Sequence, residues 1–160
     1  MKQKLALVAS SAILVSACGL AIVRGPEDQV LAQAQEIHAT AGHRCVKQTE
    51  TVLCDEGDSK RNPLLISAGP NTVGLATYTD AKATFEKTCA ELAPSIASGP
   101  KPGGYQIDCA PTKDGVDRLL IIALFPIPEG GMTDADFEAG VAAFMKDADS
   151  YVVYLKSHAR

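Results

Sequence analysis

Four cysteines in the body of the chain offer the most specific chemistry in the sequence. They stand at Cys45, Cys54, Cys89 and Cys109. In an exported chain, which the N-terminal residues discussed below predict, an even number of cysteines forms disulfides by default. Three pairings are possible. We favour Cys45–Cys54, which would close a hairpin, and Cys89–Cys109, which would join the inward faces of a helix and a strand. Each closes a short loop and would contribute about 3 kcal/mol through chain entropy.

Zinc binding by cysteine and histidine is the functional alternative, and the spacing does not favour it. No two cysteines form a C-x-x-C pair, the usual element of structural zinc sites and of thioredoxin-like dithiols. His38 and His43 are five positions apart, whereas a spacing of four stacks two imidazoles on one helix face. The sequence therefore predicts no metal site and no cofactor.

Other polar groups have simpler structural explanations than catalysis. The acidic run at 55–58 is followed at once by Lys60 and Arg61, so it predicts a solvated loop rather than a calcium loop. The serines of "LISAG" and "IASGP" lack the first glycine of a G-x-S-x-G nucleophile turn. We predict no catalytic residue, although a Ser-His-Asp triad can assemble from distant segments.

The N-terminal residues have the layout of a secretory signal peptide. A positive start, "MKQK", precedes an uncharged apolar stretch over 5–17. The next feature, "VSAC" at 15–18, resembles the lipobox of bacterial lipoproteins. That resemblance implies that the thiol of Cys18 receives a diacylglyceryl group, that the leader is cut before it, and that the new amino group is acylated. Several acyl chains anchor a protein stably where one does not.

The lipobox resemblance covers about the first 20 residues and sets the expected organisation of the chain. It implies a signal peptide over 1–17 and a lipidated tether over 18–26, followed by one domain over 27–160. Gly19 stands where inner-membrane lipoproteins carry an aspartate, so the resemblance implies the outer membrane, facing the periplasm, in a Gram-negative source. The alternative is an uncleaved anchor, because the 19 uncharged residues over 5–23 are long enough to span a bilayer.

The charge of the chain makes nucleic acid an unsuitable partner. The formal charge is −4, and without the two lysines of the leader, 13 basic residues face 19 acidic ones. A phosphate backbone would be repelled by this net charge of −6. The membrane, reached through the lipid anchor, and an unknown protein or small ligand are the expected partners.

The periodicity of apolar residues predicts an α+β domain behind an N-terminal signal helix. We expect an antiparallel sheet of four to five strands with helices packed on one face. The run "RLLIIALF" at 118–125 predicts a strand buried on both faces. Apolar steps of three and four predict a long terminal helix over 133–157, a shorter one over 80–92 that ends before Pro94, and a first helix that ends at Gly42.

These features together predict a membrane-anchored envelope lipoprotein that binds a protein or a small ligand without catalysis. One alternative is a cell-envelope hydrolase, which would need a pocket holding a histidine beside an acid and a serine. Another is a structural envelope component, which would show an exposed apolar patch on the terminal helix without a pocket.

Overall fold

The computed structural model describes residues 19–55 and 62–159. The predicted signal peptide, Cys18 and most of the acidic loop lie outside the described residues. Within the described part, no helix is both long enough and apolar enough to cross a bilayer.

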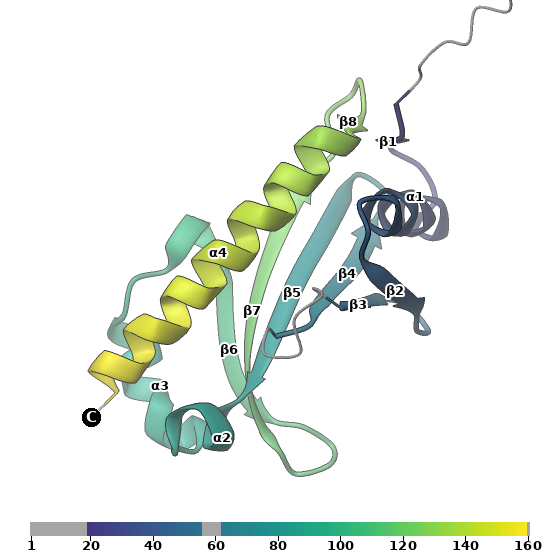
Figure 1. Ribbon diagram of the computed structural model, residues 1–160. Coiled ribbons are helices and arrows are strands. Elements are labelled where there is room, and N and C mark those ends of the chain that lie inside the picture. The colour runs from purple at the N-terminus through teal and green to yellow at the C-terminus, as the bar shows by residue number, and fades with distance from the viewer. Residues whose placement is uncertain (1–18, 56–61, 160) are drawn as a thin grey trace, which may run out of the picture.

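Six strands form one antiparallel sheet in the order β2-β3-β4-β5-β7-β6 (Figure 1). Their bounds are Arg44–Lys47 (β2), Val52–Asp55 (β3), Leu64–Gly69 (β4), Thr72–Asp80 (β5), Gln106–Pro111 (β6) and Asp117–Pro126 (β7). A second, two-stranded sheet joins Ala21–Ile22 (β1) to Met132–Thr133 (β8). The α+β class is confirmed, but the prediction of four to five strands is too low. The second sheet was not predicted, because strands as short as β1 and β8 leave no alternation of side chains for a pattern to detect.

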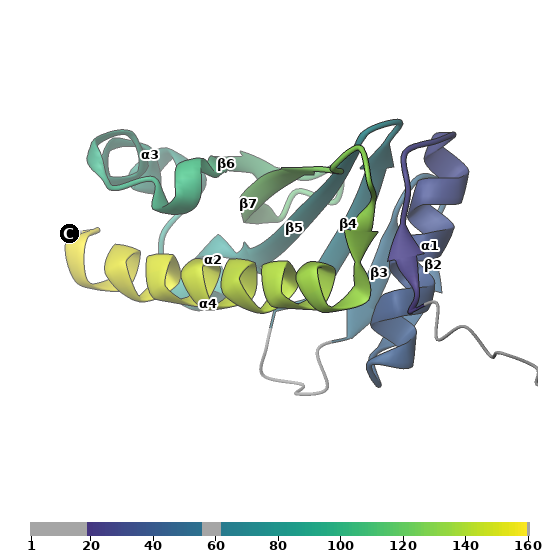
Figure 2. The ribbon, with the colours of Figure 1, turned by 90° about the horizontal axis from the view of Figure 1, so that it is seen from above.

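Four α-helices and a short 3₁₀ turn complete the fold. The helices are Glu27–Thr40 (α1), Ala81–Phe85 (α2), Cys89–Ser98 (α3) and Asp134–His158 (α4), and the turn is Pro102–Gly104 (η1). Figures 1 and 2 show α4 running along the sheet, with α1 beside the β2–β4 end and α3 beside β6. The first helix is part of the core, because Val30, Leu31 and Ile37 are buried.

The core lies between these helices and one face of the sheet. The alternate residues of β7 that point inward are Leu119, Ile121 and Ala123, none more than 4% exposed. From α4 the buried residues are Phe137, Val141, Phe144, Met145, Ala148, Tyr151 and Leu155. These α4 residues recur at steps of three and four, which places them on one side of the helix. The predicted terminal helix is confirmed.

The predicted helix over 80–92 is two helices, because the backbone turns between them. Glu86 adopts a left-handed φ of 59° and ends α2. A capping box then starts α3: Thr88 Oγ1 accepts from the Glu91 N–H at 3.3 Å, and Glu91 Oε2 accepts from the Thr88 N–H at 2.7 Å. The expectation that Pro94 ends the helix is wrong, because α3 continues past it.

Part of the predicted tether is folded against the domain. Ile22 is fully buried, and its strand pairs with β8. The Arg24 Nε–H donates to the Ile127 carbonyl at 2.7 Å. The described chain therefore begins close to the start of α4, where Gly19 lies near the Asp134 carboxylate.

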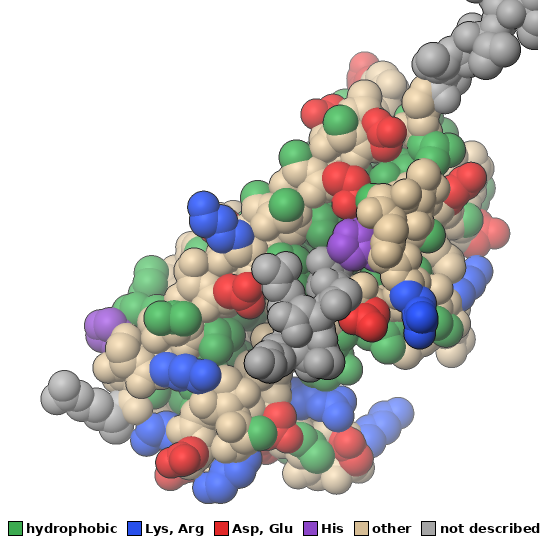
Figure 3. Space-filling view, in the orientation of Figure 1, with side chains coloured by type: hydrophobic (Ala, Val, Ile, Leu, Met, Phe, Trp, Pro, Cys, Tyr) green, Lys and Arg blue, Asp and Glu red, His purple; other side chains and the backbone are tan. Residues whose placement is uncertain are grey.

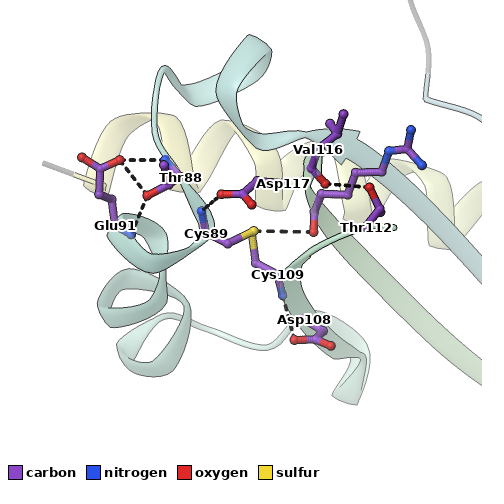
Figure 4. Close-up of a disulfide and its surroundings, with 9 residues drawn as sticks. Thr88, Cys89, Glu91, Asp108, Cys109, Thr112, Val116 and Asp117 are labelled. Atoms are coloured by element: carbon purple, nitrogen blue, oxygen red, sulfur yellow. Dashed lines mark hydrogen bonds between the residues drawn. A yellow bond between two sulfur atoms is a disulfide. The ribbon is translucent and has the colours of Figure 1, made fainter. Parts of the chain in front are cut away.

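Both favoured cysteine pairs are at disulfide distance. Cys45 and Cys54 are direct partners across β2 and β3, with an S–S distance of 2.09 Å. Cys89 at the start of α3 and Cys109 on β6 have an S–S distance of 1.99 Å (Figure 4). The Cys89 N–H also donates to Asp117 Oδ2 at 2.7 Å. The second bridge thereby ties α3 to the edge of the sheet.

Candidate functional site

The face of the sheet that points away from the helices carries many apolar side chains. On β7 this face carries Leu120 and Ile122, which are partly buried, and Leu124, which is 70% exposed. The expectation that 118–125 is buried on both faces is therefore wrong. Among the described residues, no helix packs over these outward side chains. An apolar run has the same composition whether its second face is covered or open, so the sequence did not distinguish the two.

The strand register joins these outward residues into a continuous surface, which we call the open face. Leu53 lies beside Leu65, Leu65 beside Ala76, and Ala76 beside Ile122. A second row pairs Tyr78 with Leu120. Because cross-strand neighbours on one face lie within side-chain contact, the open face is a connected apolar patch rather than a set of isolated side chains.

A groove of about 430 Å³ crosses the open face. Its floor is Leu53, Leu65, Tyr78 and Leu120, and Arg118 and Asp108 border it. The guanidinium carbon of Arg118 lies 5.0 Å from the centre of the Tyr78 ring. This distance is within the range of a cation–π contact, so the tyrosine holds the cation at the rim.

Arg118 also forms an ion pair with Asp114, and this pair is weak enough to be replaced by one with a bound partner. Its Nη2 lies 3.4 Å from Asp114 Oδ2, and both side chains are well exposed to water. Exposed pairs of this kind contribute at most about 1 kcal/mol. A hydrogen bond from the Thr112 hydroxyl keeps the pKa of Asp114 below its usual value, with a smaller effect of Arg118. Arg118 is therefore available to an acidic group on a bound partner.

A second candidate site lies on the other side of the sheet, between α1 and α4. His38 is fully buried, and its Nδ1 lies 2.8 Å from Glu138 Oε1. The His43 ring stacks on the His38 ring, with centroids 4.0 Å apart and planes 1° from parallel. The edge of Phe137 flanks His38 at 6.4 Å between centroids. In the described part of the chain, these two histidines and Glu138 are the one cluster whose donor atoms could hold a metal ion.

The helix ending explains why two histidines five positions apart can stack. The Gly42 N–H donates to the Ala39 carbonyl, and the His43 N–H donates to the His38 carbonyl, which is the hydrogen-bond pattern of a Schellman motif. Gly42 has the positive φ of 101° that this motif needs. The motif brings the residue after the glycine onto the helical residue five positions before it. The expectation from helical spacing alone, that the rings cannot meet, is therefore wrong.

A groove of about 560 Å³ extends from this cluster along α4. Figure 3 shows this side of the molecule, with acidic, basic and hydrophobic side chains interspersed along α4. Ser150 and Asp149 line the groove together with the histidines and Glu138, so it holds the residue types that the hydrolase alternative required.

Those residues do not form a catalytic triad. Ser150 follows Glu138 by twelve positions, which places it about 18 Å further along the helix axis. Its Oγ–H donates to the Lys146 carbonyl at 2.9 Å instead. The structural alternative required an exposed apolar patch on α4 without a pocket; α4 exposes Val153 but borders a groove.

Comparisons with known proteins give a likeness in fold alone. No protein-family model and no curated protein matches the sequence. Among solved structures, the chain is similar to the crystal structure titled "YbjN, a putative transcription regulator from E. coli". The two chains are 13% identical, with a TM-score of 0.56 over 80% of this chain and 92% of that one. At this level of identity the match shows a shared arrangement of elements and transfers no activity.

Proposed function

We propose that this protein is an exported, lipid-anchored envelope protein that binds an apolar segment of a partner protein on the open face of its sheet. The observation that carries the proposal is the connected apolar surface of Leu53, Leu65, Leu120 and Ile122, which no described helix covers. A soluble domain rarely leaves such a surface without a use.

Export and anchoring are supported by two independent features. The cysteine pairs at disulfide distance suit an oxidising compartment outside the cytoplasm. The lipobox-like residues 15–18 supply the lipidation site at Cys18. A lipid anchor would hold the open face near other envelope proteins, where the partner is expected.

The extent of the apolar surface favours a protein segment over a small molecule. The open face continues beyond the groove along β7 to the exposed Leu124, so an extended segment can contact more of this surface than a small molecule held in the groove. Its floor offers leucine side chains and a tyrosine ring, and its rim offers the guanidinium of Arg118. The partner segment is therefore expected to be apolar and to carry a carboxylate that reaches Arg118.

Photo-crosslinking in native membranes tests this proposal. A photoreactive residue at Leu124, which is 70% exposed on the open face, is compared with one at Val153, which is 66% exposed on α4. We expect a covalent adduct from position 124 only, mapped by mass spectrometry to an apolar segment that contains an acidic residue. In an Arg118→Glu background the adduct should weaken.

Three results would overturn the proposal. They are equal adducts from both positions, no adduct from position 124, and an adduct that joins two copies of this chain. The last would assign the open face to self-association.

A further inference from the structure

We propose that His38, His43 and Glu138 bind one divalent transition-metal ion of the Zn²⁺ type where α1 meets α4. One donor atom from each of the three residues lies within 4.8 Å of the other two. The disulfide cysteines and the open face take no part in this site, so it is independent of the proposed binding function.

The donor set determines which metal class fits. Two imidazole nitrogens and one carboxylate oxygen are ligands of Zn²⁺ and neighbouring transition metals, whereas Mg²⁺ and Ca²⁺ prefer oxygen alone. Two histidines and a glutamate are also the three protein ligands of those zinc sites whose fourth ligand is water or another small molecule. Within residues 19–55 and 62–159, no further His, Cys, Asp or Glu joins these three, and Asp149 lies about 16 Å beyond Glu138 along α4.

The existing hydrogen bond shows how the ion would enter. His38 Nδ1 and Glu138 Oε1 are 2.8 Å apart, and a carboxylate only accepts, so the imidazole N–H is the donor. A metal ion would replace this proton and coordinate the nitrogen and the oxygen together. Metal binding therefore releases a proton, as is usual for histidine ligands.

His43 is the ligand that has to move. Two stacked parallel rings keep their in-plane lone pairs in two separate parallel planes, so the observed stack cannot direct both nitrogens to one ion. Tetrahedral bonds of about 2.1 Å need donors roughly 3.4 Å apart, and the cluster extends to 4.8 Å. His43 follows the helix rather than belonging to it, so a change in its side-chain rotamer does not require α1 or α4, which hold His38 and Glu138, to move.

The surroundings favour such a site. The Glu138 side chain is 27% exposed and lines the groove along α4, which gives an ion a path from solvent. His38 is fully buried and flanked by the Phe137 ring. Packing therefore holds His38 in place, while Glu138 is accessible to solvent.

The test is Zn²⁺ binding by the full chain in detergent, measured by calorimetry and by competition with a chromophoric chelator. We expect one Zn²⁺ per chain. His43→Ala and Glu138→Gln should each weaken binding at least tenfold, because each removes one of three ligands. The matched controls, His158→Ala and Glu129→Gln, replace the same residue types at exposed positions outside the groove and should change binding less than twofold.

Cobalt gives a second readout that does not depend on the stability of a variant. Co²⁺ bound to the unmodified chain should show the intense visible absorption of four-coordinate geometry, and added Zn²⁺ should abolish it. The proposal is overturned if the unmodified chain binds neither ion stoichiometrically. It is equally overturned if His158→Ala weakens binding as much as His43→Ala does, because binding would then belong to surface histidines.

Discussion

The two faces of the six-stranded sheet differ in what covers them, although their residues are similar. On β7, Leu119 and Ile121 point into the core and are no more than 2% exposed, while Leu124 points outward and is 70% exposed. One strand thus carries apolar side chains on both faces and buries only one set. The inward set therefore stabilises the fold, while the outward set is the one to which our proposal assigns partner binding.

The largest expected effect on stability is the difference between two leucine-to-alanine variants at neighbouring positions of β7, one on each face of the sheet. Leu119→Ala removes a fully buried side chain, so we expect a loss of about 2–5 kcal/mol in the free energy of unfolding. Leu120→Ala, on the partly buried open face, should cost about 1 kcal/mol or less. Urea unfolding of both variants, with the disulfides intact, measures the two losses. Equal losses would mean that the open face is part of the core.

Removal of the Cys89–Cys109 disulfide tests how much the attachment of α3 to the edge of the sheet contributes to the free energy of unfolding. The Cys89–Cys109 bridge spans 20 positions and joins α3 to β6. Replacing both cysteines with serine should cost roughly 3 kcal/mol, and slightly less for Cys45–Cys54, which spans 9 positions. Thermal unfolding of the two double variants gives the order. If neither variant is destabilised, the disulfides do not contribute to the stability of the fold.

The capping box of α3 should make a smaller and pH-dependent contribution. Thr88→Ala removes the side chain that accepts from the Glu91 N–H, and we expect a loss of about 1 kcal/mol at neutral pH. Hydrogen bonds from the Thr88 backbone N–H and then from its hydroxyl lower the pKa of Glu91 below the usual 4.5.

The sign of the pH effect follows from that lowered pKa. The contribution of Glu91 is present above pH 4.5 and is lost as the pH falls through its folded pKa. The cost of Thr88→Ala should therefore shrink in acid. Urea unfolding of the variant and of the unmodified chain at neutral and acidic pH compares the two costs. Because Thr88→Ala keeps the backbone N–H, a cost that is constant with pH would show that the Thr88 hydroxyl makes no hydrogen bond to the Glu91 carboxylate.

The smallest effect is expected at the most exposed position of the open face. Leu124→Ser should change the free energy of unfolding by less than about 0.5 kcal/mol, because the side chain is already largely in water. The same substitution should weaken partner binding. A loss of stability comparable to that of Leu119→Ala would contradict the distinction between the faces.

The sequence predicted those features that depend on local pattern. The terminal helix over 133–157, the α+β class and the two favoured cysteine pairs all follow from periodicity and from short separations along the chain. The break at Glu86 was missed because a left-handed residue interrupts an apolar pattern that continues on both sides. The open face was missed because apolar composition does not say which face is covered.

The histidine cluster was also missed, and a sequence signal for it does exist. Gly42 directly before His43 favours the helix ending that folds His43 back onto His38. Glu138, 100 positions from His38, reaches the cluster only through the packing of α4 against α1. Long-range packing of this kind leaves no trace in the spacing of residues. The lipobox assignment at Cys18 stays a prediction, because that residue lies outside the described part.

The most direct test of the account is the effect of Leu120→Asn on the adduct formed from position 124 in native membranes. Unfolding is measured on the same preparation. The account predicts that the adduct falls several-fold while the free energy of unfolding changes by about 1 kcal/mol or less. An adduct that persists, with the chain still folded, would contradict the claim that the open face binds the partner.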